Sequence, residues 1–237
     1  MSIEGLRVGL CGVGTVGLAT VKILRDQSAM LAARCSQTVS ITHVGARREM
    51  PHQDYAAARI SRDVMDVARD PDVDVLVELI GGTTVARDLI KLAIEQGKHV
   101  VTANKALIAE HGNELILLAE QAGVQLRFEA AVAGGIPVIK TLREAMAAND
   151  VSEVAGIING TGNFILTEMT TKGRSYEDVL AEAQALGYAE ADPTFDVDGT
   201  DAAHKLVILA SLAFGLPLDA EAPVKQGIQS ITPEDLE

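Results

Sequence analysis

The stretch Leu6-Arg-Val-Gly-Leu-Cys-Gly-Val-Gly-Thr-Val-Gly17 decides the fold. Its first half, Leu6–Cys11, predicts a short buried strand. A G-x-G-x-x-G motif follows directly, and apolar residues then recur at helical spacing from Val16 onward. A lone glycine motif is weak evidence, but a strand before it and a helix after it are the context that a dinucleotide-binding turn requires.

Each glycine of this motif has a physical task at a phosphate site. Gly12 permits the tight turn, Gly14 lets the backbone approach a pyrophosphate, and Gly17 lets helix and strand pack closely. The helix N-terminus adds N–H donors and a positive dipole end. We therefore predict dinucleotide binding through Gly12, Val13, Gly14, Thr15, Val16 and Gly17; the alternative is a glycine-rich turn without a ligand.

The strand predicted at Val39–Gly45 indicates which dinucleotide binds. A site selective for NAD usually ends this strand with an acidic residue that bonds the ribose 2′-hydroxyl. This chain has Ala46-Arg47-Arg48 instead, and a guanidinium can hold a 2′-phosphate through two hydrogen bonds. We predict NADP as cofactor through Arg47 and Arg48, with NAD as the alternative. The alternative is that Arg47 and Arg48 are solvent-exposed loop residues that bind no ligand.

Further strands and helices complete an α/β pattern. The run 74–80 (DVLVELI) predicts a strand buried on both faces, and Gly81-Gly82-Thr83-Thr84 follows it, with Thr84 as the predicted cap of a helix through Ile94. A strand at His99–Thr102 precedes Ala103-Asn104-Lys105. Open α/β sheets bind ligands at the carboxyl ends of their strands, so Lys105 is a candidate site residue.

The second half of the chain differs in character. A strand at 124–130 leads into a loop with two glycines, and Pro137 suits the first turn of a helix to about Ala148. We place the domain boundary in this region, giving domains of residues 1–135 and 136–237. Alternation over 151–158 predicts a strand, 159–163 turns it into a helix, and Ser175-x-x-Asp178 begins another in the manner of a capping box.

The stretch Ala183–Lys205 (AQALGYAEADPTFDVDGTDAAHK) is the strongest candidate for a site. It combines an acidic loop with the start of a helix on which Asp201 and Lys205 stand four residues apart, on one face. An exposed pair of this kind would contribute only a few tenths of a kcal/mol. The apolar residues from Leu206 to Ala213 instead predict a largely buried helix, where unpaired charges are costly.

Composition excludes several classes of protein. The chain has 237 residues, 48% of them hydrophobic, which suffices for two modest cores. A net charge of −13 disfavours nucleic acid or an anionic membrane as partner. No apolar run is long enough to span a membrane and no secretory signal begins the chain. Two cysteines form no disulfide framework, so we expect a cytoplasmic protein.

The acidic stretch resembles the sequence signature of the homoserine dehydrogenases. The match includes Ala183, Gly187-Tyr188-Ala189, Asp192-Pro193, Asp196-Val197, Gly199, Asp201 and Lys205. The resemblance extends from about Arg7 to the C-terminus. It implies a Rossmann-type, doubly wound parallel sheet followed by a smaller α+β domain for catalysis and dimerisation, here incomplete at its C-terminal end because family members continue further.

The resemblance also implies an activity and roles for residues. The activity is NAD(P)-dependent interconversion of L-aspartate 4-semialdehyde and L-homoserine, a step toward threonine and methionine. Lys205, held by Asp201, is the expected acid/base, with Lys105 as its partner or competitor. The expected substrate ligands are Glu190, Asp196 and Asp201. Thr83, Ala103 and Lys105 are expected at the cofactor.

Two further features follow from the resemblance. The loop after the strand at 124–130 is expected to bind a monovalent cation, sodium, through Glu129, Val132, Gly134 and Ile136. Oxygen ligands suit such a hard cation, although from the residues alone the two glycines would indicate a hinge between domains. The expected assembly is a homodimer formed through residues beyond about 150, and the substrate is a small molecule.

Two other functions share part of this sequence pattern. An acylating semialdehyde dehydrogenase would share the dinucleotide fold but needs a thiolate nucleophile, and neither Cys11 in the nucleotide turn nor Cys35 suits that role. A nucleotide-binding regulatory module without turnover is the alternative outside the enzymes, and the short C-terminal part of the chain is the reason to retain it beside the leading enzyme hypothesis.

Overall fold

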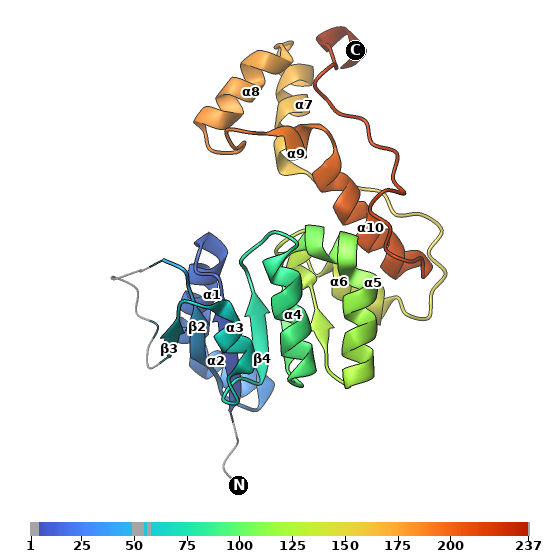
Figure 1. The fold of residues 1–237 in the computed structure, drawn as a ribbon. Helices are drawn as coiled ribbons and strands as arrows, with labels where there is room; N and C mark the ends of the chain where they lie inside the picture. Colours follow the sequence, from blue (N-terminus) through green and yellow to red (C-terminus); the bar gives the residue numbers. More distant parts are fainter. Residues whose placement is uncertain (1–4, 49–54, 56–57, 237) are drawn as a thin grey trace. The chain divides into compact units, whose positions relative to one another are not determined.

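The computed structural model describes residues 5–48, 55 and 58–236 of the chain. Contacts between residues divide the chain into two compact units, Met1–Gly135 and Ile136–Glu237, and Figure 1 draws both. Each unit has a hydrophobic cluster of its own.

The first unit is built on a six-stranded parallel sheet with the order β3-β2-β1-β4-β5-β6. Its strands are β1 (Leu6–Cys11), β2 (Val39–Gly45), β3 (Arg59–Ser61), β4 (Val75–Glu78), β5 (His99–Thr102) and β6 (Leu126–Arg127). The chain winds outward from β1 to β3 and then returns to the other side of β1 at β4. This reversal defines a doubly wound sheet, so the predicted fold class is confirmed.

In the described part of this unit, five helices connect the strands: α1 (Thr15–Asp26), α2 (Ser28–Cys35), α3 (Val64–Arg69), α4 (Val85–Glu95) and α5 (Lys105–Ala122). Crossovers between parallel strands are right-handed. The reversal of winding therefore places α1 and α2 on one face of the sheet and the other three helices on the opposite face. There α3 packs on α4 and α4 on α5, as Figure 1 shows.

Three strands of the sheet confirm the sequence prediction. β1, β2 and β5 have the predicted limits. β4 is shorter than the predicted 74–80, because the N–H groups of Ile80 and Gly81 donate to the carboxylate of Glu78, at 2.8 and 3.1 Å, instead of continuing the ladder.

Two local predictions in this unit need correction. The strand predicted at 124–130 is reduced to Leu126–Arg127, because a 3₁₀ helix begins at Glu129. Thr84 does stand at the N-cap of α4, but its side chain makes no capping hydrogen bond. Its φ of −87° and ψ of −71° are helical, whereas a capping side chain needs extended backbone.

The described part of the second unit is helical. It contains α6 (Val138–Lys140), a π-helical turn (Thr141–Ala145), α7 (Gly160–Lys172), α8 (Tyr176–Ala185), α9 (Thr194–Val197), α10 (Thr200–Phe214) and a 3₁₀ helix (Pro233–Leu236). Helix α7 packs against α8 and α9 (Figure 1). Their shared core consists of Ile165, Met169, Tyr176, Val179 and Val197.

The helix predicted from Pro137 to about Ala148 is interrupted. Thr141 Oγ1 donates to the Pro137 carbonyl at 2.7 Å, a back-bond that bends helices. The next turn widens, so that Met146 N–H donates to the carbonyl of Thr141, five residues earlier. The regular helix is therefore limited to Val138–Lys140.

The strand predicted at 151–158 is wrong. These residues have no regular secondary structure, because the described part of the unit contains no strand with which their backbone could pair. Ile157 is 80% exposed. A strand forms only with a hydrogen-bonded neighbour, so alternation alone did not suffice.

Other predictions in the second unit hold. Ser175 Oγ accepts from the N–H of Asp178 at 3.2 Å, which confirms the predicted cap of α8. Helix α10 buries its inner face, including Val207, Ile208 and Leu209. Its burial is less complete than predicted, since Leu206 is 40% exposed and Phe214 41% exposed.

Candidate functional site

The ion pair between Asp201 and Lys205 lies in the second unit, within α10. Lys205 Nζ donates to Asp201 Oδ2 at 2.6 Å and to the Ile158 carbonyl at 2.6 Å. The Asp201 side chain is 5% exposed and that of Lys205 17%. The pair is therefore largely removed from water, where such a pair persists only with good geometry and further hydrogen bonds.

Those further hydrogen bonds come from the start of α7. Asn159 Nδ2 donates to Asp201 Oδ2 at 2.9 Å and to Asp196 Oδ1 at 2.8 Å. Thr161 Oγ1 lies 3.0 Å from Asp196 Oδ2 and 2.9 Å from the Tyr188 carbonyl. Two carboxylates and one ammonium are thus held in a single network.

This network forms one wall of a pocket of about 480 Å³. The pocket is lined by Asn159, Gly160, Thr161, Phe164, Tyr188, Asp196, Asp201 and Lys205. The rings of Phe164 and Tyr188 contact each other edge to face, with centroids 5.2 Å apart. The structure therefore brings three of the predicted residues, Asp196, Asp201 and Lys205, into one cavity.

Glu190 is placed differently from these residues. It is exposed and is not among the residues that line the pocket. Its carbonyl accepts from Gln184 Nε2 at 3.1 Å, which ties the acidic loop back to α8. Sequence reasoning missed Asn159, Thr161 and Tyr188 as pocket residues. The position of Asn159 and Thr161 just after the predicted strand at 151–158 was the available signal.

The glycine motif of the first unit has the geometry that a phosphate-binding turn requires. Gly12 has a φ of +100°, and a Cβ there would lie 2.5 Å from the Leu79 carbonyl oxygen. At Gly17 a Cβ would lie 2.0 Å from the carbonyl oxygen of Gly12. At Gly14 a Cβ would meet nothing within 4 Å. Two glycines therefore serve packing, whereas Gly14 borders open space.

Helix α1 begins at this open space. Gly14 is its N-cap and no side chain caps its first N–H groups. Thr15 and Val16 are exposed there, and Val13 is half-buried. Uncapped N–H groups at a helix N-terminus form an anion site, so the turn fits the pyrophosphate of a dinucleotide.

Basic side chains follow the carboxyl end of β2. Arg47 and Arg48 are both exposed, next to the buried Ala46. Arg62, from the loop after β3, donates through Nη1 to the Ala46 carbonyl at 3.2 Å. Sequence reasoning missed Arg62, because only the pairing of β2 with β3 brings it to this end of the sheet.

Glu78 organises the carboxyl ends of β4 and β5. Its carboxylate is fully buried and accepts from the N–H groups of Ile80 and Gly81, just after β4. It also accepts from Thr102 Oγ1 at 2.5 Å. Thr102 Oγ1 in turn accepts from Asn104 N–H at 3.0 Å, and Asn104 Nδ2 donates to the Gly82 carbonyl at 2.7 Å. The loops after β4 and β5 are thereby joined.

The remaining cofactor candidates of the first unit lie on these two loops. Thr83, Ala103 and Lys105 are all half-buried. Lys105 is the first residue of α5, whose N-cap Asn104 accepts from Leu107 N–H at 3.1 Å. The sequence signal for Glu78 was an acidic residue within an apolar run, three residues before Gly81.

The predicted cation loop follows β6. Glu129 is half-buried in a short 3₁₀ helix (Glu129–Ala131), and the buried Val132 follows it. The backbone then takes left-handed φ values at Ala133 (+50°) and Gly135 (+87°) on either side of the exposed Gly134. The Ile136 carbonyl accepts from Val138 N–H at 2.8 Å. Oxygen donors on a tight turn suit a hard cation.

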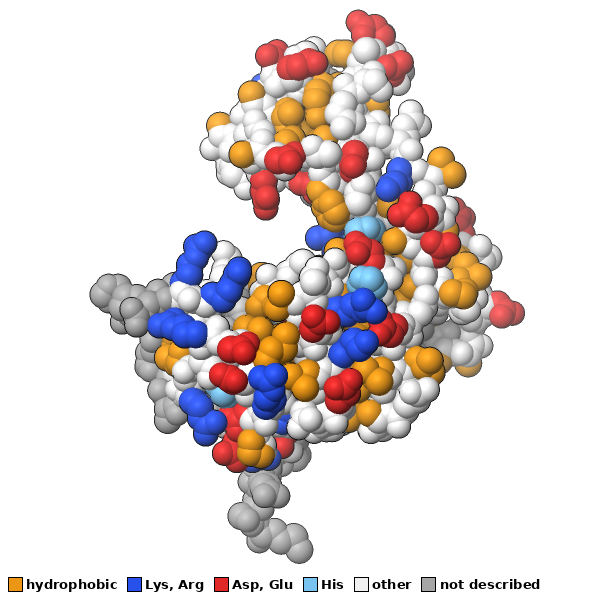
Figure 2. Space-filling view, in the orientation of Figure 1, with side chains coloured by type: hydrophobic (Ala, Val, Ile, Leu, Met, Phe, Trp, Pro, Cys, Tyr) orange, Lys and Arg blue, Asp and Glu red, His pale blue; other side chains and the backbone are white. Residues whose placement is uncertain are grey.

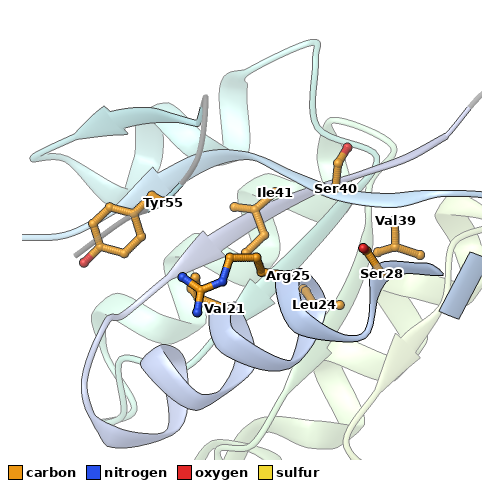
Figure 3. Close-up of a pocket in the computed structure, with 8 residues that line it drawn as sticks. All are labelled: Val21, Leu24, Arg25, Ser28, Val39, Ser40, Ile41 and Tyr55. Carbon is orange, nitrogen blue, oxygen red and sulfur yellow. The ribbon is translucent and has the colours of Figure 1, made fainter. Parts of the chain in front are cut away.

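A second cavity in the first unit is unrelated to the glycine turn. It encloses about 250 Å³ and is lined by Val21, Leu24, Arg25, Ser28, Val39, Ser40, Ile41 and Tyr55 (Figure 3). Val39, Ser40 and Ile41 are the first three residues of β2, whereas Gly12 follows the last residue of the parallel strand β1. The cavity therefore borders the end of the sheet opposite the phosphate turn.

The cysteines do not support a thiolate mechanism. Burial, with a smaller contribution from Glu78, raises the pKa of the Cys11 thiol far above its ordinary value. Cys35 is exposed at the end of α2.

Among the described residues no cluster of three His, Cys, Asp or Glu side chains could hold a metal ion. No helix within the described ranges has the length and apolar character to cross a membrane.

Two family models match the chain in succession. The NAD-binding domain of homoserine dehydrogenase matches residues 12–129, and the homoserine dehydrogenase model matches residues 137–237. Homoserine dehydrogenase from Pseudomonas aeruginosa is 57% identical over 99% of this chain and 54% of its own length.

Solved structures agree with this match. Homoserine dehydrogenase from Thiobacillus denitrificans has a TM-score of 0.94 and 49% identity, covering 98% of this chain and 54% of its own. A protein from Archaeoglobus fulgidus provisionally named homoserine dehydrogenase has a TM-score of 0.87 and 35% identity, covering 97% and 75%. A hyperthermophilic archaeal homoserine dehydrogenase solved with NADPH has a TM-score of 0.81 and 25% identity, covering 96% and 75%.

The chain spans about half the length of the curated relatives it matches. Within that span both units align with the same family. The chain belongs to the homoserine dehydrogenase family.

Proposed function

We propose that this chain carries out the NADPH-dependent reduction of L-aspartate 4-semialdehyde to L-homoserine, and the reverse oxidation. Membership of the family supports this assignment. The observation that carries it is the Lys205 ammonium, held by Asp201 and the Ile158 carbonyl at the wall of the pocket.

Lys205 is suited to be the proton donor. A lysine ammonium has three N–H groups, and two acceptors within the described chain, Asp201 and the Ile158 carbonyl, take two of them. The third remains for a ligand in the pocket. NADPH, when bound, supplies a hydride to the aldehyde carbon. The aldehyde oxygen then gains negative charge, which Lys205 neutralises by proton donation. Lys105, in the first unit, is proposed as a second acid/base candidate, either as partner or as competitor of Lys205.

Carboxylates are proposed to hold the amino end of the substrate. Asp196 and Asp201 line the pocket, and Glu190 lies on the acidic loop between α8 and α9. Figure 2 shows acidic side chains spread over the visible face of the second unit with few basic ones among them. Such a surface attracts an ammonium group, which the substrate carries beside its carboxylate.

The first unit is proposed to bind the cofactor. Gly12, Val13, Gly14, Thr15, Val16 and Gly17 would hold the pyrophosphate, while Thr83, Ala103 and Lys105 would border the nicotinamide. Arg47 and Arg48, with Arg62 beside them, favour NADP over NAD because guanidinium groups bind a 2′-phosphate. One relative in this family has been solved with NADPH.

A monovalent cation and a second subunit complete the proposal. Glu129 and the carbonyls of Val132, Gly134 and Ile136 are proposed to bind sodium. The homodimer is proposed to form through residues beyond about 150, where Ile157 and Val224 are highly exposed. Light scattering at micromolar concentration should give twice the mass of the chain, and a monomer would contradict the dimer.

The test of the function is a direct assay. The chain is mixed with NADPH and aspartate semialdehyde, and the loss of NADPH absorbance is followed with and without sodium. Stoichiometric formation of homoserine is the expected result. Binding of NADPH without turnover, under all of these conditions, would instead identify a nucleotide-binding regulatory module.

A further inference from the structure

Asn159 connects helix α7 to the charged groups of the pocket. It is the N-cap of α7, and its Oδ1 accepts from the N–H of Gly162 at 2.6 Å. On its other side, Nδ2 donates to Asp196 Oδ1 at 2.8 Å and Asp201 Oδ2 at 2.9 Å. All three of these hydrogen bonds come from one small side chain.

The chemistry of the partners fixes the orientation of this amide. A backbone N–H can only donate, so the atom facing Gly162 must be the oxygen. The nitrogen then faces two carboxylates, which can only accept when ionised. The reversed amide would place an oxygen against both carboxylates and a donor against a donor.

Asn159 and the residue before it hold both members of the ion pair. The Ile158 carbonyl accepts from Lys205 Nζ at 2.6 Å, and Asn159 Nδ2 donates to Asp201 Oδ2. Asp201 Oδ2 is also the atom that Lys205 contacts. The ammonium is therefore located by two consecutive residues at the start of α7 as well as by its own helix.

We propose that Asn159 is a positioning residue: its amide sets the separation of Asp196 and Asp201 and thereby the place of the Lys205 ammonium in the pocket. The consequence for turnover rests on the proposed function, whereas the positioning of Lys205 does not. Asn159 itself touches no reacting atom in this scheme.

Helix capping alone does not explain the choice of Asn. Asp and Ser cap helices about as well as Asn. Asp would present a third carboxylate to Asp196 and Asp201, and like charges at this range repel. Ser would keep the cap but is too short to reach both carboxylates. Variants at this position therefore separate capping from positioning.

The experiment compares Asn159→Asp and Asn159→Ser with Ser175→Ala. Ser175 caps α8 in the same unit through one side-chain acceptor and is not one of the residues that line the pocket, so it is the control for loss of a cap. Thermal unfolding, kcat and KM for aspartate semialdehyde, and NADPH affinity are measured on the full 237-residue chain. The ¹⁵N–¹H signal of the Lys205 ammonium, assigned with Lys205→Arg, is the readout that needs no turnover.

Asn159→Ser should lower kcat about tenfold to hundredfold, as expected for loss of a hydrogen bond to a charged group. Asn159→Asp should lower it further because charge is added. In both variants the Lys205 signal should shift or broaden, while NADPH affinity and most of the melting temperature are retained. Ser175→Ala should keep both kcat and the Lys205 signal.

Two outcomes are kept apart by this design. If Asn159→Asp is folded and its Lys205 signal coincides with that of the unaltered chain, the positioning role is overturned. If the unaltered chain shows no turnover, the proposed function fails, and the ammonium signal in the two Asn159 variants still decides the role of Asn159.

Discussion

Lys205 donates to Asp201 across one turn of α10 at 2.6 Å, and both side chains are largely shielded from solvent. The pair Glu168–Lys172 on α7 has the same spacing along its helix and the same distance of 2.6 Å. There, however, the lysine side chain is 58% exposed. Identical local geometry thus occurs in two environments, which makes the second pair a control for the first.

Replacing Lys205 by Ala should abolish the proton donor. Positioned general acids contribute about 10²–10⁴ in rate, so kcat should fall by that factor while NADPH affinity stays near normal. Lys172→Ala should leave kcat unchanged, since exposed helix pairs contribute about 0.3–0.5 kcal/mol of stability. The measurement is turnover per folded molecule, with folding checked by circular dichroism. Near-normal turnover of folded Lys205→Ala would end the proposal.

The glycines of the motif should separate into two kinds. Gly17→Ala places a methyl group against the Gly12 carbonyl and should lower the free energy of unfolding by about 1–3 kcal/mol. Gly14→Ala meets nothing and should cost less than about 1 kcal/mol, as a poorer N-cap. Its effect should appear instead as weaker NADPH binding, measured by fluorescence titration. Equal losses of stability in both variants would contradict this division.

Replacing Arg47 and Arg48 together by Ala should weaken NADPH binding far more than NADH binding. Charge-assisted hydrogen bonds contribute about 1.5–3 kcal/mol each. Arg34→Ala with Arg127→Ala removes the same charge from exposed positions on α2 and β6 and controls for the overall field. If both cofactors lose affinity equally, the two arginines do not recognise the 2′-phosphate.

Glu78 should be important for stability as well as for loop geometry. Glu78→Ala leaves the N–H groups of Ile80 and Gly81 and the Thr102 hydroxyl without their acceptor. The buried Thr102 hydroxyl alone should cost about 1–3 kcal/mol. Glu78→Gln should cost less, because one oxygen remains. A double-mutant cycle of Glu78→Gln with Thr102→Val, followed by urea unfolding, should give a coupling of about 0.5–3 kcal/mol. Additive effects would show that the 2.5 Å contact contributes little.

Acid should remove a stabilising contribution from Asp74. Arg7 holds the pKa of Asp74 below its ordinary 3.8, chiefly by side-chain hydrogen bonds of 2.7 and 3.0 Å, although burial opposes the shift. A carboxylate whose pKa is lower in the folded protein than in the unfolded chain stabilises the fold at pH values above its unfolded pKa. That contribution is lost as the pH falls through its folded pKa. Asp74→Asn should therefore be less stable at pH 7, and its deficit should shrink below about pH 3.8.

The comparison for this last prediction is Asp66→Asn. Asp66 makes an exposed pair of 3.7 Å with Arg69. The difference in melting temperature between Asp66→Asn and the unaltered chain should therefore change little between pH 7 and pH 3. A constant deficit of Asp74→Asn across that range would show that its role does not depend on its charge.

The sequence by itself determined the parts of this protein whose causes are local. The limits of β1, β2 and β5, the strand–glycine–helix turn and the cap at Ser175 all depend on residues close together in the chain. Side-chain periodicity, glycine placement and capping act over one or two turns, so these features can be recognised directly in the amino-acid sequence. The spacing of Asp201 and Lys205 is local in the same sense.

Tertiary structure alone decided which distant residues surround that pair. Asn159 and Asp201 are 42 residues apart in the chain, and the Ile158 carbonyl is 47 residues from Lys205. Glu78 and Thr102 likewise meet only because β4 and β5 are neighbours. Segment 151–158 remained without a ladder for the converse reason, since a strand needs a partner that its own pattern cannot supply. Hydrogen bonds between distant segments depend on the packing of whole elements, and no short pattern specifies that packing.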